Sequence, residues 1–178
     1  MIYEPSEDSF LLADVVKKYS KGKSVLDIGT GSGIQAISAI SSGAKFVLAS
    51  DINEEALKHV KTAYTNIQTI HSNLFSNISG KFDLIIFNPP YLPADKREDA
   101  ESQEVTTGGK KGDEIIIKFL KHAKEHLSKN GIILLVLSSL TPHADIQAIV
   151  NKEYSSMTLE KKEAYFMEVL EVWKISGL

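Results

Sequence analysis

The segment from Asp27 to Gly33 has an acid followed by three glycines at alternate positions. Glycine permits a tight turn from a strand into a helix and lets a ligand approach the backbone closely. A dinucleotide-binding fingerprint would need its third glycine at position 34, where this chain has Ile34. A leading carboxylate suits a cationic ligand, whereas it would repel a pyrophosphate. The segment is therefore typical of a cofactor loop that is not of the NAD type.

A second acid, Asp51, lies 18 residues after Gly33, at the end of an apolar run that predicts a strand. One carboxylate can accept hydrogen bonds from two vicinal ribose hydroxyls. Asp51 and Asn53 are also residue types that cap the start of a helix. The glycine loop and Asp51 occur in the right order on the right elements, and together they indicate a nucleotide-type cofactor.

These two features resemble the S-adenosyl-L-methionine (AdoMet) binding segments of class I methyltransferases. The resemblance implies that Asp27 lies near the methionine ammonium, that the glycines pack under the cofactor, and that Asp51 holds the ribose. Asn73 stands where the family often has an acid against the adenine amine, and a simple turn residue is an equally good interpretation of it. The complete set of cofactor contacts implied is Asp27, Gly29, Thr30, Gly31, Gly33, Asp51, Ile52, Asn73, Leu74 and Asn88.

The tetrapeptide Asn88, Pro89, Pro90 and Tyr91 follows another apolar run, which places it at the same sheet edge as the loop. Prolines fix φ and lack an N–H, so this segment is stiff and presents carbonyl acceptors. The Asn88 side-chain oxygen can accept one N–H of a substrate NH₂ group, and the Pro89 carbonyl can accept the other. Tyr91 can cover the attached planar group. Two such acceptors would help to localise the lone pair of an amide nitrogen and aim it at a sulfonium methyl, so we predict that these four residues are catalytic.

The tetrapeptide resembles that of amino-methyltransferases that act on NH₂ groups of planar systems, namely glutamine amides, adenine N6 or guanine N2. The segment from Tyr3 to Phe10 narrows the choice, because it resembles the start of short HemK-related methyltransferases, and residues 108–114 resemble the same group. Those enzymes modify the glutamine of the Gly-Gly-Gln motif in class 1 peptide chain release factors. The substrate contacts implied by this resemblance are Glu7, Asp8, Ser9, Asn88, Pro90 and Tyr91.

Bacterial members of that group carry an extra N-terminal domain that binds the release factor, and we expect this chain, at 178 residues, to lack one. The resemblance is therefore to the short archaeal and eukaryotic branch, in which the enzyme commonly pairs with a small zinc-binding activator protein. Three alternatives stay open: methylation of adenine N6 or guanine N2 in nucleic acid, methylation of a protein lysine, and a non-catalytic AdoMet-binding subunit.

The composition is that of one soluble globular domain, with 178 residues, 43% of them hydrophobic and 24% charged. The net charge of −3 and the single arginine, Arg97, argue against direct nucleic-acid binding. The lack of cysteine excludes disulfides, cysteine nucleophiles and thiolate zinc sites. The longest apolar run, Ile132 to Leu137, is too short to span a membrane, and no targeting segment is visible. We expect a cytoplasmic protein.

Strands alternate with helices along the chain, which predicts an α/β fold with a mostly parallel sheet. The methyltransferase resemblance makes this a class I, Rossmann-like fold with seven strands, an antiparallel terminal hairpin and helices on both faces. The expected strands are 24–28, 46–50, 67–70, 82–87 and 132–137, followed by two more between 158 and 175 that join near 163–164. The expected helices are 6–19, 34–40, 53–64, 113–127 (stopped by Gly131) and 141–152. Residues 1–178 form one domain, and the polar stretch 93–112 is expected to be a substrate loop.

His122, Glu125 and His126 match a His-x-x-Glu-His pattern that some metalloproteases use. Two histidines four residues apart can share one face of a helix. The apolar stripe of the expected helix lies beside them, and no third ligand is evident nearby. We therefore predict no metal site.

Overall fold

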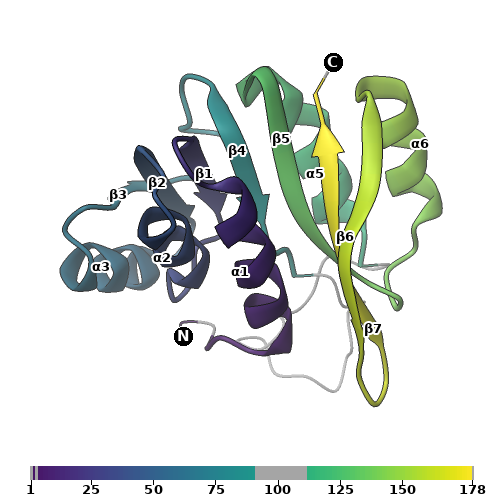
Figure 1. Cartoon of the computed structure of the whole chain (residues 1–178), viewed down its shortest axis with the longest axis horizontal. Coiled ribbons are helices and arrows are strands. Elements are labelled where there is room, and N and C mark those ends of the chain that lie inside the picture. The colour runs from purple at the N-terminus through teal and green to yellow at the C-terminus, as the bar shows by residue number, and fades with distance from the viewer. Residues whose placement is uncertain (1, 3, 91–111, 178) are drawn as a thin grey trace.

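The structure of the chain is a computed structural model, and it describes residues 2, 4–90 and 112–177. Figure 1 shows a twisted sheet with helices packed on both of its faces. The strands are β1 (Ser24–Ile28), β2 (Phe46–Asp51), β3 (Gln68–His71), β4 (Phe82–Phe87), β5 (Leu127–Ser138), β6 (Ser156–Ala164) and β7 (Val169–Ser176). The helices are α1 (Glu7–Tyr19), α2 (Ile34–Ser41), α3 (Glu54–Ala63), α5 (Glu114–Ala123) and α6 (Ala144–Glu153), with a 3-10 turn η1 (Lys124–His126) after α5. No helix within the described ranges has the length and apolar character needed to cross a membrane.

The sheet has seven strands in the order β3-β2-β1-β4-β5-β7-β6. Strands β1 to β5 pair in parallel, whereas β7 runs antiparallel to both β5 and β6. The predicted α/β architecture, with its antiparallel terminal hairpin, is thus confirmed. The chain builds β2 and β3 on one side of β1 and then crosses to build β4 and β5 on the other side. The strand order therefore reverses between β1 and β4, which is where ligands bind in open α/β sheets.

Each face of the sheet has its own hydrophobic core. Strand β4 shows the alternation, because Leu84 and Ile86 pack toward α1 and α2 while Ile85 and Phe87 pack toward α5 and α6. All four of these side chains are almost completely buried. A shift of the pairing by one residue would exchange the two faces of the strand, so burial on both sides fixes the register.

The boundary between helix α5 and strand β5 differs from the sequence prediction. The α-helix ends at Ala123, and β5 begins at Leu127 instead of Ile132. The β4–β5 pairing shifts register between Phe82 and Leu84, so the polar residues 128–131 form an irregularity inside the strand. Such a bulged polar stretch looks in sequence like the turn after a helix.

Gly131 consequently lies within β5 and does not end a helix. A Cβ at this position would lie 2.9 Å from the Ser128 carbonyl oxygen and 3.0 Å from that of Phe82. The glycine is needed here because two backbones approach each other closely.

The terminal hairpin also turns later than predicted. Strand β6 continues to Ala164, β7 begins at Val169, and the residues between them form the turn. Tyr165 donates its backbone N–H to the Glu168 carbonyl at 2.8 Å across that turn. The tip carries two exposed apolar side chains, Phe166 and Met167. An apolar turn lacks the glycine and asparagine that usually mark a hairpin in sequence, which explains the error.

Gly33 provides a test of how tightly the glycine loop packs. Its φ is 86°, and a Cβ on it would lie 2.8 Å from Val60 Cγ2. We expect Gly33→Ala to lower the free energy of unfolding by about 2–4 kcal/mol, from left-handed strain together with overpacking. Gly80→Ala is the matched control, because Gly80 has a φ of 85° and no atom within 4 Å of its Cβ position. Urea unfolding of both variants measures the difference, and equal losses would show that the Val60 contact has no effect.

Candidate active site

Three strand ends meet at the point where the strand order reverses. Ile28 at the end of β1 pairs with Ser50 of β2 on one side and with Phe87 of β4 on the other. The next residues along these strands are Gly29, Asp51 and Asn88. The sheet therefore brings the predicted glycine loop, the second acid and the start of the proline tetrapeptide to one edge, the lower edge of the sheet in Figure 1.

The glycine loop has a backbone that other residues would adopt only with strain. Gly29, Gly31 and Gly33 have φ values of 67°, 51° and 86°. The loop is fixed by hydrogen bonds from the Thr30 N–H to the Ser50 carbonyl (2.9 Å) and from the Gly33 N–H to the Thr30 carbonyl (2.8 Å). The result is a turn between β1 and α2 that is held by backbone hydrogen bonds.

Asp27 lies buried beneath this loop. Its Oδ2 accepts hydrogen bonds from Thr30 Oγ1 at 2.7 Å and from the Ala36 N–H at 3.2 Å. Burial raises the pKa of Asp27 to about 7, the two hydrogen bonds act in the opposite direction, and the nearby charge of Asp51 adds to the rise. A carboxyl group in this state would be stabilised in its ionised form by a cation that enters the site.

Asp51 ties the loop to the start of α3. Its Oδ2 accepts from the Gly31 N–H at 2.9 Å, and its Oδ1 accepts from the Asn53 N–H at 2.8 Å. The Asn53 side chain accepts from the Glu55 N–H at 2.9 Å, so Asn53 is the helix cap that its residue type predicts. Each carboxylate oxygen of Asp51 can accept a further hydrogen bond. The ribose contact stays a prediction.

Residues near the ends of β2 and β3 complete the predicted cofactor set. Ile52 is exposed beside Asp51, and its carbonyl lies 2.9 Å from His71 Nε2. Asn73 is exposed, whereas Leu74 is buried with a φ of 51°. A leucine with a positive φ is strained, and such strain is common at ligand sites. The roles of Ile52, Asn73 and Leu74 toward an adenosine group stay predictions.

The nitrogen and the oxygen of the Asn88 side-chain amide have different surroundings. Its Nδ2 donates to Asp8 Oδ2 at 3.0 Å. Its Oδ1 is buried, and no hydrogen-bond partner for it is present among the described residues. A buried acceptor without a partner is costly in a folded protein, so it points to a ligand donor. Pro89 is buried and Pro90 is half-buried beside it.

The predicted substrate residues at the start of α1 separate into two kinds. Glu7 is exposed and bonds to Ser6, whereas Asp8 and Ser9 are buried. Asp8 Oδ1 accepts from the Ser9 N–H at 2.6 Å, so this carboxylate lies between α1 and Asn88. Asp8 therefore contacts the predicted catalytic asparagine directly. A substrate contact from Glu7, Asp8 or Ser9 stays a prediction.

The sequence analysis missed Gln35, the side chain that anchors the start of α1. Its Nε2 donates to the Ser9 carbonyl at 2.9 Å, while its Oε1 is buried without a partner among the described residues. The only sign in the sequence was a polar side chain between Ile34 and Ala36, in a helix that is otherwise mostly apolar. Gln35 connects α2, and thus the glycine loop before it, to α1.

Tyr91 and nearly all of the predicted substrate loop at 93–112 lie outside the described residues. The His-x-x-Glu-His pattern is described, and it does not sit on one helix because α5 ends at Ala123. His126 lies 3.2 Å from the Gly80 carbonyl and stacks on Phe75. Among the residues that the structure describes, no three His, Asp or Glu side chains group as metal ligands would.

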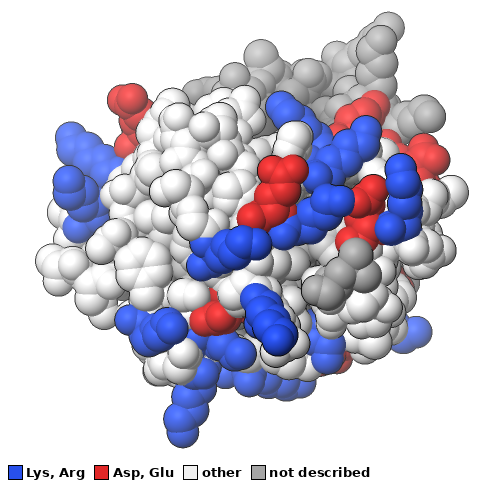
Figure 2. All heavy atoms as spheres, turned by 90° about the horizontal axis from the view of Figure 1, so that it is seen from above, with Lys and Arg blue, Asp and Glu red and all other residues white. Residues whose placement is uncertain are grey.

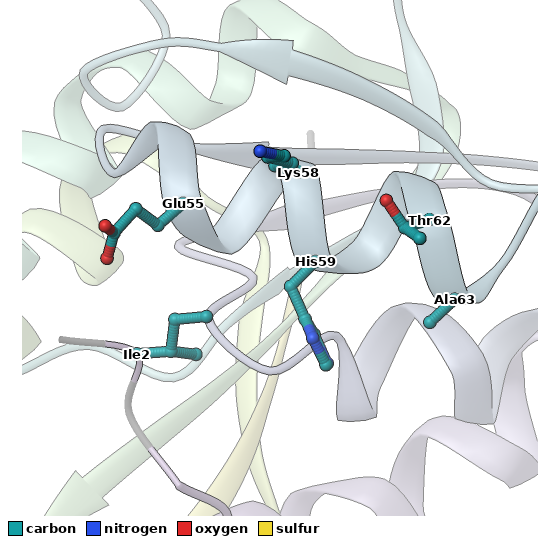
Figure 3. Close-up of a pocket in the computed structure, with 6 residues that line it drawn as sticks. All are labelled: Ile2, Glu55, Lys58, His59, Thr62 and Ala63. Atoms are coloured by element: carbon teal, nitrogen blue, oxygen red, sulfur yellow. The ribbon is translucent and has the colours of Figure 1, made fainter.

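A surface hollow of about 500 Å³ lies between the N-terminal segment and α3. Figure 3 shows the residues that line it, which are Ile2, Glu55, Lys58, His59, Thr62 and Ala63. None of these is a predicted site residue. The glycine loop, Asp51 and Asn88 remain the candidate active site.

Solved structures with the same fold include those of methyltransferases. Mtq2 of E. cuniculi, solved in its complex with Trm112, has a TM-score of 0.79 and 22% sequence identity, and the comparison covers 99% of both chains. The ribosomal protein L11 methylase of Lactobacillus delbrueckii subsp. bulgaricus has a TM-score of 0.70 and 23% identity, covering 97% of this chain and 80% of that one. The fold is thus that of the class I AdoMet-dependent methyltransferases.

The sequence matches the family described as Methyltransferase small domain over residues 6–170, and the chain belongs to this family. MJ0928 of Methanocaldococcus jannaschii, named provisionally as a protein N5-glutamine methyltransferase, is 41% identical over 146 residues, which are 79% of this chain and 74% of that protein. Methyltransferase HEMK2 of Mus musculus is 30% identical over 154 residues, covering 76% and 71%. The prediction of a HemK-related, AdoMet-dependent methyltransferase is confirmed.

The raised pKa of Asp27 predicts how the ligand-free protein responds to pH. The folded chain holds this proton more tightly than the unfolded chain, because the pKa rises from 3.8 to about 7 on folding. Wild-type stability should therefore fall as the pH rises through this window, by at most about 1.4 kcal/mol per pH unit. Asp27→Asn cannot ionise and keeps an oxygen for Thr30, so its stability relative to wild type should increase from pH 5 to pH 7. Urea unfolding at several pH values measures this, and a difference that does not change with pH would contradict it.

Proposed function

We propose that this enzyme transfers the methyl group of AdoMet to the side-chain amide nitrogen of the glutamine in the Gly-Gly-Gln motif of a class 1 peptide chain release factor. The observation that carries the proposal is the buried Asn88 Oδ1, an acceptor without a partner among the described residues, beside the glycine loop. The names of the relatives support the same substrate, since one from Borreliella burgdorferi is a release factor glutamine methyltransferase. It is 38% identical over 125 residues, which are 64% of this chain and 44% of that protein.

The residues at the sheet edge fit AdoMet, which supplies a methyl group on a positively charged sulfonium. The buried carboxyl of Asp27 can hold the ammonium of the methionine part, and an ionised Asp27 is favoured by that charge. The bare backbone of Gly29 and Gly31 leaves room for the methionine chain. Asp51 can accept from the ribose hydroxyls, and Ile52 presents an apolar surface beside it.

On the acceptor side, the chain supplies hydrogen-bond acceptors where a substrate NH₂ group brings donors. Asn88 Oδ1 takes one N–H, and the Pro89 carbonyl takes the other. These two bonds orient the amide nitrogen and favour a pyramidal nitrogen over a planar one, which makes its lone pair available to the methyl group. A strong base before the attack is unnecessary, because the proton can leave after the nitrogen has acquired its positive charge.

Adenine N6 and guanine N2 present the same N–H donors as a glutamine amide. The feature that separates a nucleic-acid substrate from a peptide is the negative charge of its phosphates. Figure 2 shows one face of the molecule with acidic side chains between several of its lysines. Ion pairs of lysines include Lys174 with Glu160 at 3.1 Å and Lys161 with Asp14 at 2.9 Å. Mixed charges and a net charge of −3 give little attraction for a phosphate backbone.

A small zinc-binding activator protein is the second part of the proposal. The resemblance to the short branch of the group supports such a partner, and Mtq2 of E. cuniculi was solved in a complex with Trm112. Strand β3 lies at the outer edge of the sheet, where its backbone can pair with an added strand. We expect enzyme purified from cells that also express such a partner to be more active than enzyme expressed alone.

The substrate is tested by mass spectrometry after incubation with AdoMet and the release factor of the same organism, with and without the partner protein. We expect one methylation on the Gly-Gly-Gln glutamine, seen as a mass increase of one CH₂, because a methyl group replaces one hydrogen of the side-chain amide. A release factor with glutamate in place of that glutamine is the control, and it should gain nothing. Methylation of DNA, of ribosomal RNA or of a lysine under the same conditions, with none on the glutamine, would replace this proposal by that alternative.

Asn88→Ala tests the catalytic role of the amide. We expect kcat to fall about 10²–10³-fold, the scale for losing one preorganised hydrogen-bonding group, and AdoMet affinity to fall far less, because Asn88 is only one of the ten cofactor contacts that the resemblance implies. The loss should fall mainly on kcat, because the bond matters most as the nitrogen becomes pyramidal. Calorimetry with AdoMet and a steady-state assay on the release factor separate the two effects. Full activity in this variant would refute the assigned role and return the non-catalytic subunit as the better hypothesis.

A further inference from the structure

We propose that Asp8 is a positioning residue that fixes the amide orientation of Asn88, so that an acceptor and not a donor faces the substrate. This inference rests on the proposed role of Asn88 in binding a substrate NH₂ group. The two residues are 80 positions apart and belong to α1 and to the end of β4, yet Asn88 Nδ2 donates to Asp8 Oδ2 at 3.0 Å.

The orientation of an asparagine amide is decided by its hydrogen-bond partners, because its oxygen and nitrogen have nearly the same size. On the oxygen side of Asn88 the described residues offer no partner. On the nitrogen side stands a carboxylate, which can only accept hydrogen bonds while it is ionised. A flipped Asn88 would place its oxygen against Asp8 and lose a charge-assisted bond, so the contact with Asp8 selects the orientation.

Asp8 is itself held in place by the start of its helix. The Ser9 N–H belongs to the first turn of α1, where backbone donors have no partner within the helix. It donates to Asp8 Oδ1 at 2.6 Å, and Ser9 Oγ donates to the same oxygen at 3.1 Å. The Ser9 carbonyl is in turn anchored by Gln35 of α2. One oxygen of Asp8 is thus committed to α1, which leaves the other facing Asn88.

Replacing the Asp8 carboxylate by an amide is expected to reverse the orientation of the Asn88 side chain. In Asp8→Asn the new side chain must still accept from the buried Ser9 N–H with its oxygen, so its NH₂ group faces Asn88. Asn88 then turns its oxygen inward and presents its NH₂ group to the substrate. The site would offer a donor where the substrate NH₂ also brings donors, and binding in the reactive geometry would fail.

An exchange of the two side chains provides the test. Asp8→Asn should lower kcat about 10–100-fold, by analogy with the loss of a partner that orients a metal-binding side chain. Asn88→Asp should also be impaired, because two carboxylates then face each other. The double variant Asp8→Asn/Asn88→Asp restores one donor facing one acceptor and leaves an oxygen toward the substrate. We expect it to regain at least about tenfold in kcat over either single variant.

A readout that needs no substrate separates this inference from the proposed function. In the wild-type protein the side-chain NH₂ protons of Asn88 should exchange with solvent more slowly than those of Asn66, an exposed asparagine that serves as the control. Nuclear magnetic resonance of the side-chain amides measures both, and Asp8→Asn should remove the protection of Asn88. Thermal unfolding and AdoMet binding show that each variant is folded.

The outcomes are distinct. Rapid exchange of the Asn88 NH₂ protons in wild type, or an unimpaired kcat in Asp8→Asn, would overturn the positioning role. A folded double variant no more active than the single ones would overturn it as well. Slow exchange together with no methylation of any release factor would leave the Asp8–Asn88 contact standing and refute the proposed substrate instead.

Discussion

The burial of three carboxylates at one edge of the sheet is the constraint on which the rest of the site depends. Asp8, Asp27 and Asp51 are each no more than 9% exposed. Buried charge is costly unless it is hydrogen-bonded, and each of these side chains accepts from a backbone N–H nearby. The loops at this edge must therefore fold so that their N–H groups point at the acids. A cation that enters this edge would favour the ionised form of the buried Asp27 carboxyl.

The same hydrogen bonds make the site rigid across elements that are distant in sequence. Asp51 connects the glycine loop to α3, Asp27 connects that loop to the first turn of α2, and Asp8 connects α1 to the end of β4. The register of β1 with β2 and with β4 fixes how far along the strand direction the glycine loop, Asp51 and Asn88 lie from one another. Methyl transfer tolerates little displacement of the reacting groups. Strands and helix ends support this geometry, and hydrogen bonds to the buried aspartates fix the loops.

The sequence was sufficient for the alternating elements and for the three strand ends, because these follow from local periodicity and from glycine and proline chemistry. It was insufficient where the outcome depends on tertiary contact. The bulge at 128–131 could not be separated from a helix end, since polar residues and a glycine occur in both. The link from Gln35 to Ser9 and the link from Asp8 to Asn88 join different elements, so no local pattern contains them. Resemblance gave Asp8 as a substrate residue, and the structure shows it bonded to Asn88.

An asparagine held by a carboxylate differs physically from a carboxylate placed directly at position 88. Both present an oxygen acceptor, but with Asn88 the formal charge stays on Asp8, one hydrogen bond further from the reacting nitrogen. A carboxylate in direct contact would hold a substrate NH₂ more strongly before the reaction and could keep the proton that the product must lose. It would also be a fourth acid at an edge that already buries three, and its charge would lie next to that of Asp8. The neutral amide keeps the acceptor while limiting this repulsion, and Asp8 polarises it through the shared hydrogen bond. The price of this arrangement is that the amide can flip, and the fixed carboxylate of Asp8 removes that freedom.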